Sequence, residues 1–379
     1  MKYAQHIFQG DLNEFRLSDY FKDSYDWVLV FGNRFLLENP ENQLIISNQF
    51  SGSVISGCST SGEFSGSEVD APTISITAIS FERTKILQKS VQIDNFPSSK
   101  DAGKTLISSF EETDLRHIFI ISDGTQVNGS QLVEGMNHTL GDSVTLSGGL
   151  AGDAGLFEKT LVLNDTGNWQ QGCISAIGFY GDVEISCGSA GGWTSFGMEK
   201  TITQSKANVL YEIVGQPALE MYKNLLGERS KELPGAALLF PLLLSVPNET
   251  EPVVRTILGI NDEDQSLTFA GDMPVGSVVR LMKSNNENLV MGAHEACVAA
   301  TQHLSETPNL AILVSCVGRK LVLKDQVFRE VDAIRNYFDK QKNVVVSGFY
   351  SYGEIAPFYR TMDCKLHNQT MTVTLIREL

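Results

Sequence analysis

Residues 347–354 read Ser-Gly-Phe-Tyr-Ser-Tyr-Gly-Glu and follow the apolar run Val344-Val345-Val346. A β-branched run that ends abruptly in glycine and polar residues predicts a buried strand entering a tight loop. The same order of residues occurs at 54–63, Val-Ile-Ser-Gly-Cys-Ser-Thr-Ser-Gly-Glu, and at 144–153, Val-Thr-Leu-Ser-Gly-Gly-Leu-Ala-Gly-Asp. Three copies predict an internal repeat, which is a statement about architecture. We call residues 57–63, 148–153 and 348–354 the first, second and third Ser–Gly loops.

Each Ser–Gly loop is preceded by a helical pattern and, before that, by another buried apolar run. These earlier runs end in polar or glycine residues at Gly32-Asn33-Arg34, Ser122-Asp123-Gly124 and Gly318-Arg319. Strand–helix–strand crossovers of this length imply neighbouring parallel strands with both loops at one edge of the sheet. Since ligands in such folds usually bind outside the carboxyl ends of the strands, we expect the Ser–Gly loops to form pocket walls.

The predicted fold is therefore α/β, with repeated strand–helix–strand units that form mixed sheets covered by helices. Gly215-Gln216-Pro217 interrupts the pattern, so we expect two domains, residues 1–215 and 216–379. Period-two alternation at 73–79 and 86–93 predicts a pair of antiparallel strands. We expect helices at 11–24, 98–112, 128–140, 217–227, 286–304 and 325–340. We expect further strands at 201–213, 236–246, 253–260, 277–282 and 371–376.

Composition limits the class of partner. The 379 residues carry a formal net charge of −16, which argues against nonspecific binding to nucleic acid or to an anionic membrane. The six cysteines form no Cys-x-x-Cys pair, so a closed zinc site or a redox dithiol is not expected. The N-terminus has no apolar signal core, and the longest apolar run, 235–246, is too short to span a bilayer. We therefore expect a cytoplasmic protein.

Nucleophilic catalysis is one interpretation of the first Ser–Gly loop. Cys58 and Ser59 place a thiol and a hydroxyl at a strand-to-loop turn. The Gly-x-Ser-x-Gly elbow is missing because position 61 is serine, and no histidine stands in a recognisable partner motif. The competing interpretation is that these small residues cap the following segment and satisfy backbone groups. The phosphate-binding glycine motifs are also missing, which argues against nucleotide binding by those routes.

Three carboxylates occupy matching places in the repeats, namely Glu63, Asp153 and Glu354. Together they could bind a metal or an ammonium group. Alternatively, each accepts hydrogen bonds from loop amides and holds its own turn. The sequence offers no firm set of metal ligands.

Arg319 follows a buried strand, where an arginine can grip a carboxylate through two parallel hydrogen bonds. Tyr350 and Tyr352 in the third Ser–Gly loop would supply flat walls and hydroxyl groups. Arginine, tyrosine and glutamate together suit a small zwitterion such as an amino acid. Haem is a further possibility, because it needs only one axial histidine and an apolar slot. The candidate axial ligands are His138 and His294, although a lone helical histidine is more often a surface or satisfied core residue.

These motifs resemble the FIST family of sensory domains over nearly the whole chain. The first two Ser–Gly loops are similar to its amino-terminal domain. The segments 315–319, 348–357 and 367–370 (His-Asn-Gln-Thr) are similar to its carboxy-terminal domain. The resemblance implies a cytoplasmic, non-catalytic module of signal transduction that senses a small molecule, with amino acids proposed as ligands.

The resemblance also implies a separate signalling partner, since no output domain is recognisable in the chain. In this family such a partner is a histidine kinase or a cyclic-di-GMP enzyme. Two alternatives remain open. The first is a haem-based nitric oxide sensor, as some family members are. The second is an acyl- or amide-transfer enzyme that uses Cys58 or Ser59.

Overall fold

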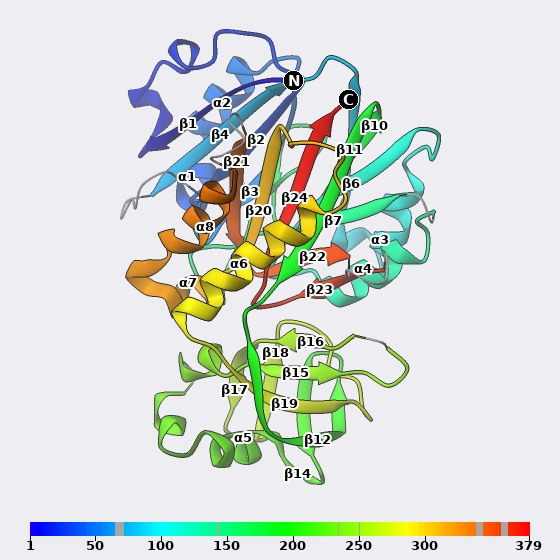
Figure 1. Cartoon of the computed structure of the whole chain (residues 1–379), viewed down its shortest axis with the longest axis vertical. Helices are drawn as coiled ribbons and strands as arrows, with labels where there is room; N and C mark the ends of the chain where they lie inside the picture. The colour runs from blue at the N-terminus through cyan, green and yellow to red at the C-terminus, as the bar shows by residue number, and fades with distance from the viewer. Residues whose placement is uncertain (65–71, 142–143, 234, 250, 339–343, 358–362) are drawn as a thin grey trace.

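The computed structural model describes residues 1–379 except 65–71, 142–143, 234, 250, 339–343 and 358–362. The chain forms a large body of three sheets and a smaller body below it (Figure 1). It enters the small body through β12 (Thr194–Lys206) and returns to the large body through β19 (Val278–Lys283) and α6 (Asn286–Thr301). Within the described residues, no helix is both long and apolar enough to cross a membrane.

Sheet one has the strand order β1-β4-β2-β3-β8-β9. Its strands are Lys2–Gln9 (β1), Trp27–Gly32 (β2), Val54–Ser59 (β3), Thr73–Ser80 (β4), Val162–Leu163 (β8) and Trp169–Gln170 (β9). Strands β2 and β3 are parallel, and α1 (Arg34–Glu38) and α2 (Pro40–Gln49) connect them. Pro40 begins α2, because proline fits the first helical turn, where no amide donor is needed.

Sheet two has the order β23-β22-β7-β6-β10-β5. Its strands are Thr84–Gln92 (β5), Leu115–Ser122 (β6), Thr145–Leu150 (β7), Cys173–Gly181 (β10), Gly353–Pro357 (β22) and Cys364–His367 (β23). Strands β6 and β7 are parallel, and α4 (Gly129–Asn137) connects them beside α3 (Ser99–Ser108).

Sheet three has the order β11-β24-β20-β21. Its strands are Val183–Ala190 (β11), Leu310–Cys316 (β20), Val345–Ser351 (β21) and Met371–Glu378 (β24). Strands β20 and β21 are parallel, and α7 (Val317–Leu323) and α8 (Phe328–Phe338) lie between them in the chain. Helix α6 (Asn286–Thr301) packs across β11 and β24.

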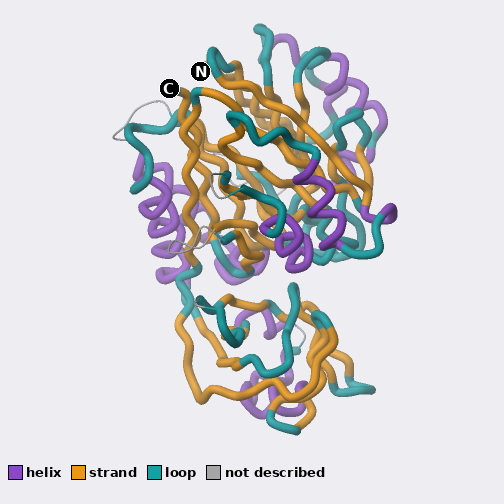
Figure 2. Tube along the Cα trace, turned by 90° about the vertical axis from the view of Figure 1, so that its right-hand side faces the viewer, coloured by secondary structure: helices purple, strands orange, loops and turns teal. Residues whose placement is uncertain are grey.

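The small body is a curved sheet around its own core, with one helix packed against it (Figure 2). Its helix is α5 (Ala218–Leu226). Its strands are Thr194–Lys206 (β12), Val209–Ile213 (β13), Gln216–Pro217 (β14), Leu242–Ser245 (β15), Val253–Arg255 (β16), Ile257–Asn261 (β17), Ser266–Phe269 (β18) and Val278–Lys283 (β19). Short 3-10 helices occur at Leu12–Glu14, Leu17–Asp19, Ile93–Asn95, Gly227–Glu232, Gly235–Leu239 and Lys324–Gln326.

The pairing register of the parallel strands confirms the predicted repeat. In each unit the glycine of the Ser–Gly loop lies beside its parallel neighbour, in the pairs Val30–Gly57, Ile120–Gly148 and Leu313–Gly348. A β-carbon at these glycines would lie 2.0, 1.9 and 1.9 Å from the neighbour's carbonyl oxygen. Side chains are excluded at such distances, so the Ser-Gly pattern marks a place where two strands approach too closely for any other residue.

The three units also exchange strands in a cycle. Cys58 at the edge of the first unit pairs with Val162, which follows the second Ser–Gly loop. Gly149 of the second unit pairs with Glu354 of the third loop, and Phe349 of the third unit pairs with Glu63 of the first loop. Each unit therefore completes the open edge of another. One apolar core lies between all three sheets, with Trp27, Phe119 and Phe349 each coming from a different sheet.

The predicted α/β fold of repeated units with mixed, helix-covered sheets is confirmed, but three local predictions are wrong. The strands at 73–79 and 86–93 do not pair with each other, because β4 joins sheet one and β5 joins sheet two. Residues 11–24 contain two short 3-10 helices instead of one helix. Only the end of 236–246 is a strand (β15), since residues 235–239 form a 3-10 turn under the large body.

Candidate functional site

The three Ser–Gly loops meet at the centre of the large body. The Ser61 amide donates to the Tyr350 carbonyl (2.8 Å), and the Tyr350 amide donates to the Gly62 carbonyl (2.8 Å). The Gly152 amide donates to the Ser59 carbonyl (2.9 Å), which joins the second loop to the first. The loops are therefore neighbours, as their place at the strand ends implies, but they bond to each other's backbone and pack closely.

Asp153 holds its own turn. Its carboxylate accepts hydrogen bonds from the amides of Phe157 (2.8 Å), Glu158 (2.9 Å) and Lys159 (2.9 Å), and from the Tyr352 hydroxyl. The ring of Tyr352 stacks on Phe157 at 4.2 Å between centroids. Burial and the Asp153 hydrogen bond raise the pKa of Tyr352. Both side chains thus stabilise the segment after the second Ser–Gly loop.

Glu63 accepts hydrogen bonds from the hydroxyls of Thr60 and Thr73. Burial raises its pKa, while the two hydroxyls and the nearby Lys320 ammonium oppose that change. The Lys320 amine donates to the Ser61 carbonyl at 2.7 Å, and burial lowers its pKa. Glu63 and Lys320 therefore influence each other's pKa beside the first Ser–Gly loop, while their hydrogen bonds go to the loop and to Thr73.

Arg319 is fully buried and forms an ion pair with Glu330, which is also fully buried (2.9 Å). Its remaining donors bond to the carbonyls of Gly191 (2.6 Å) and Leu289 (2.7 Å). Glu330 also accepts from the hydroxyls of Ser315 (3.2 Å) and Tyr350 (2.6 Å). A ligand carboxylate would have to displace Glu330 to reach Arg319, so the geometry gives this arginine a structural partner within the chain.

Cys58 and Ser59 lie in a buried strand end. The Cys58 thiol is fully buried, and burial with the nearby Glu63 carboxylate raises its pKa well above the ordinary value. The Ser59 hydroxyl accepts a hydrogen bond from the Leu161 amide at 2.9 Å. A thiol becomes a nucleophile by losing its proton, so this environment opposes catalysis through Cys58.

His138 and His294 are both exposed on helices, His138 at the end of α4 and His294 within α6. The His294 ring lies 5.6 Å from that of Tyr337. An axial ligand at either place would hold haem at the surface, so the geometry favours neither. Within the described residues, no three His, Cys, Asp or Glu side chains are grouped to hold a metal ion.

A further group of buried polar residues lies at the junction of the two bodies, in the turn between β23 and β24. Asn368 is fully buried, and neither its amide oxygen nor its amide nitrogen has a hydrogen-bond partner among the residues that the structure describes. The side-chain oxygen of the adjacent Gln369, also fully buried, likewise has no partner within the described part of the chain. Most buried polar atoms in proteins are paired, so three atoms without a described partner on consecutive side chains make this place a candidate polar site. We call residues 367–370, together with Glu354, the junction site.

Glu354 is the predicted site residue that belongs to the junction site. Its carboxyl group accepts hydrogen bonds from the Ser351 hydroxyl (2.6 Å) and from the Thr370 amide (3.1 Å) and hydroxyl (2.9 Å). Burial raises its pKa to about 8. A pKa in this range favours the protonated, neutral form of the carboxyl group near neutral pH.

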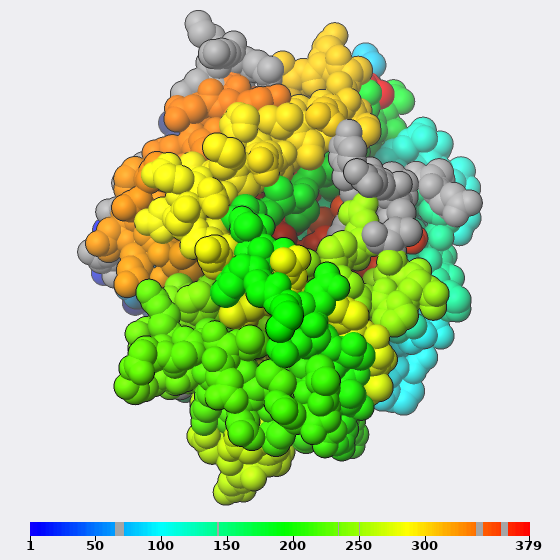
Figure 3. Space-filling model, turned by 60° about the horizontal axis from the view of Figure 1, so that its bottom comes forward, coloured from blue at the N-terminus to red at the C-terminus, as the bar shows by residue number. Residues whose placement is uncertain are grey.

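Both bodies enclose the junction site. The Gln369 side-chain nitrogen donates to the Leu238 carbonyl of the small body (3.1 Å), and the Trp193 indole donates to the Gln369 carbonyl (2.8 Å). Arg255 of β16 donates to the Leu366 carbonyl (2.9 Å). Figure 3 shows the surface hollowed between α6 in yellow and the start of the small body in green, with the red C-terminal segment at its floor.

No pattern in the sequence indicates a role for Asn368 and Gln369. The segment 367–370 stands out only by its resemblance to a family motif. A signal was present, since four successive polar residues come immediately before a buried strand. Whether their side chains find partners depends on residues far away in the chain, which composition and periodicity do not reveal.

A polar site enclosed between two bodies lies where small-molecule sites preferentially occur in proteins. The comparison with protein families is specific. The FIST N domain matches residues 26–216 and the FIST C domain matches residues 218–357. The chain therefore belongs to the FIST family, whose domains are sensory domains of signal transduction.

One curated relative is an uncharacterized protein of Methanocaldococcus jannaschii. It is 24% identical over 332 residues, which cover 79% of this chain and 63% of the relative. The chain thus spans less than two thirds of the length of that protein. The expected division into residues 1–215 and 216–379 stays a prediction. Strands β11 and β24, which lie on either side of this boundary in the chain, pair in one sheet.

Proposed function

We propose that the protein is a non-catalytic sensor that binds a small polar molecule, with an amino acid as the preferred class, at the junction site. The observation that carries this proposal is the buried Asn368 side chain, whose donor and acceptor both lack a partner among the described residues. A primary amide can donate to a carboxylate and accept from an ammonium group, so it suits both ends of a zwitterion. The unpaired Gln369 oxygen supplies a second acceptor.

Energetics support a ligand in this place. Leaving a buried amide group without hydrogen bonds costs about 1–3 kcal/mol, and a bound molecule that satisfies it recovers that energy. An enclosed site also excludes water, which strengthens each polar contact. Ordered water could recover part of the same energy, and the binding experiment below separates water from a ligand.

The position of the site suggests how binding would become a signal. The polar contacts across the junction include Arg255 with Leu366, Asn128 with Asp272 (2.8 Å), and Gln369 with Leu238. A ligand that binds one arrangement of the two bodies more tightly shifts the population toward it. We propose that a separate signalling protein in the cytoplasm, such as a histidine kinase or a cyclic-di-GMP enzyme, reads that shift.

The experiment is a melting series on the purified protein with each of the common amino acids, and with haemin in a separate series. A ligand at 100 times its dissociation constant adds about 2.7 kcal/mol of stability, so a true ligand raises the melting temperature clearly. We expect at least one amino acid to do so. A panel that leaves the melting temperature unchanged contradicts the proposal. Haemin uptake with a Soret band would replace it with the haem alternative.

A further inference from the structure

Strand β1 (Lys2–Gln9) forms a long open edge of the large body. It is the first strand in the order of sheet one and pairs, among the described strands, with β4 alone. Figure 1 shows it in dark blue at the left-hand edge of the large body. Its eight residues keep one unbroken register with β4, from Lys2 opposite Ser80 to Gln9 opposite Thr73. A regular edge of this length is a template on which another strand can pair.

The hydrogen bonds between β1 and β4 tell which backbone groups of β1 face outward. In an antiparallel ladder, pairs of residues that exchange hydrogen bonds alternate with pairs that do not. The Gly10 amide donates to the Pro72 carbonyl (3.0 Å), and this pair continues the register of β1 and β4. Even-numbered residues of β1 therefore bond to β4, while Tyr3, Gln5 and Ile7 direct their amides and carbonyls away from the sheet. Within the described part of the chain, these outward groups have no hydrogen-bond partner.

Most other sheet edges in the described part of the chain are short or carry charges. Strands β9, β16 and β23 have two, three and four residues, and β17 has five with a shift of register. Strand β5 is long, but it carries Lys85 and Lys89, and the Glu378 carboxylate accepts a hydrogen bond from its Thr84 amide (2.9 Å). Short length, lysines and irregular pairing are the usual protections of an edge strand.

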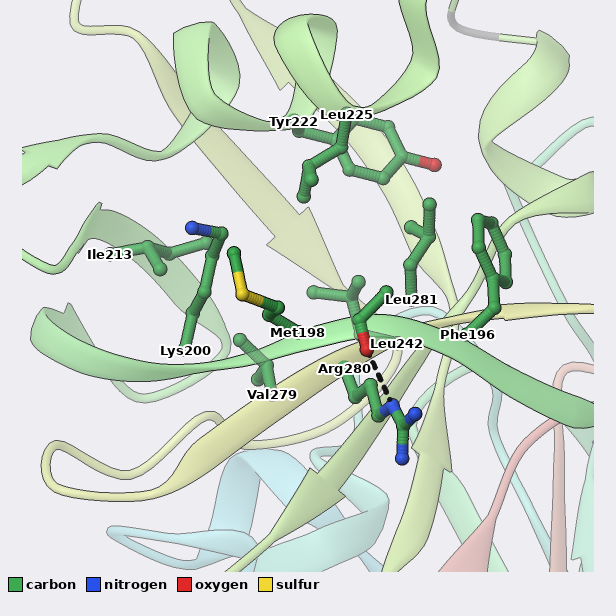
Figure 4. Close-up of a pocket in the computed structure, with 11 residues that line it drawn as sticks. Phe196, Met198, Lys200, Ile213, Tyr222, Leu225, Leu242, Val279, Arg280 and Leu281 are labelled. Carbon is green, nitrogen blue, oxygen red and sulfur yellow. Dashed lines mark hydrogen bonds between the residues drawn. The ribbon is translucent and has the colours of Figure 1, made fainter.

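Other unpaired backbone groups are covered from within the chain. The first Ser–Gly loop bonds along β21, and α6 packs along β11. Where the pairing of β12 and β19 is interrupted in the small body, the Gly197 carbonyl accepts a hydrogen bond from Arg280 Nε (2.9 Å; Figure 4). Strand β1 differs from these edges, because it is long and regular and carries lysine only at its first position.

We propose that β1 pairs with the β1 of a second copy of this chain, which gives a two-fold symmetric dimer with sheet one continued across the interface. A two-fold axis perpendicular to the sheet makes the two strands antiparallel. With this axis at Gln5, Gln5 lies opposite Gln5 of the second copy, and Tyr3 lies opposite Ile7 of the second copy. The outward amides and carbonyls of all three residues then find partners in the other copy.

The side chains of β1 favour a second copy as the occupant of this edge. Tyr3 is 47% exposed, and the proposed register places it beside a β-branched residue, a combination that stabilises antiparallel pairs. The symmetry forms this contact twice. Strand β1 contains no acidic residue, although the chain carries 45, so the pairing sets no carboxylates of the two strands against each other. A basic partner segment would find no opposite charge within this strand.

The dimer goes beyond the proposed sensor function and does not depend on the junction site. Its test is sedimentation velocity of the full chain from about 1 µM to about 200 µM, because association depends on concentration. We expect the mass to rise with concentration from 41.6 kDa, the mass of one chain, toward twice that value. A mass of one chain throughout this range overturns the proposal.

The variant Tyr3→Pro removes one outward amide from each copy. Proline is tolerated at an edge position whose amide makes no bond within the sheet, so we expect the variant to fold. We expect the dissociation constant of the dimer to rise by at least about tenfold, because two hydrogen bonds are lost by symmetry. The matched control Tyr3→Val keeps the amide and a strand-forming side chain, and it should remain dimeric. A dimer that is equally tight in Tyr3→Pro overturns the assignment of β1 as the interface.

Hydrogen exchange of the wild type gives a second test that does not depend on how the variant folds. The amides of residues 2–9 should exchange more slowly at high than at low protein concentration, while those of residues 84–92 in β5 should not change. Exchange at residues 2–9 that is independent of concentration overturns the proposal. Asn368→Leu should leave the dimer intact, so the dimer and the sensor function can fail separately.

Discussion

Replacing Arg319 with methionine tests whether this arginine is structural. The substitution keeps most of the side-chain volume and removes the charge. Among the described residues, it leaves the carboxylate of Glu330, which has no exposed surface, with the hydroxyl donors of Ser315 and Tyr350. Removing one member of a buried ion pair costs about 3–5 kcal/mol, and we expect Arg319→Met to lower the free energy of unfolding by that amount.

The control is Arg329→Met. Arg329 forms an ion pair of similar length with Glu287 (2.8 Å), but the two side chains are 33% and 72% exposed. Such surface pairs contribute about 0–1 kcal/mol. Urea unfolding followed by tryptophan fluorescence gives the midpoint and slope for both variants. If Arg319→Met lowers the free energy of unfolding no more than Arg329→Met does, then the ion pair with Glu330 is not essential to the fold. In that case Arg319 is again a candidate ligand-binding residue.

Three further predictions concern the Ser–Gly loops. Gly348→Ala places a β-carbon 1.9 Å from the Leu313 carbonyl oxygen at φ +147°, and we expect it to lower the free energy of unfolding in urea by at least about 2–3 kcal/mol. The control Gly259→Ala, where a β-carbon meets nothing within 4 Å, should lower it by less than about 1 kcal/mol. Equal losses for the two variants would refute the close approach of the strands. Burial raises the pKa of Glu354 to about 8 from 4.5, so the folded state holds this proton more tightly than the unfolded state does. The stability of the wild type relative to Glu354→Gln should therefore fall as the pH rises from about 4.5 to 8. A stability difference that does not change with pH would contradict this. The buried Cys58 thiol, with its raised pKa, should resist a thiol reagent in the native protein and react after unfolding; rapid native labelling, located at Cys58 by peptide mapping, would revive the nucleophile hypothesis.

The repeat could be predicted from the sequence because its signal is local. An apolar run followed by Ser-Gly reports a buried strand with a close neighbour, and the three glycines proved to occupy one register position. The meeting of the loops also followed, since parallel strands end at one edge. The exchange of strands between units could not be predicted, because Val162 reaches Cys58 only through the tertiary fold.

The candidate site was harder to predict for the same reason. The residue type of Arg319 indicates a carboxylate partner, but the sequence does not say whether that partner is a ligand or Glu330. For Asn368, the informative property is that its amide lacks a partner, which becomes visible only when every neighbour is placed. Glu354 was identified from its position in the repeat, while its high pKa arises from burial by distant segments.

The most direct test of the central claim compares Asn368→Leu with Asn42→Leu in the melting series. Asn42 is an equally buried asparagine, but it bonds to the Leu12 amide (2.8 Å), to Asp11 (2.9 Å) and to the Leu36 carbonyl (2.9 Å). Replacing a buried polar group that has no partner costs little, whereas replacing a paired one leaves its partners unsatisfied. The account predicts that Asn368→Leu melts at or above the temperature of the wild type without ligand and loses the stabilisation by the amino acid. Asn42→Leu should melt lower and keep that stabilisation. An Asn368→Leu variant that still responds fully to the amino acid would contradict the account.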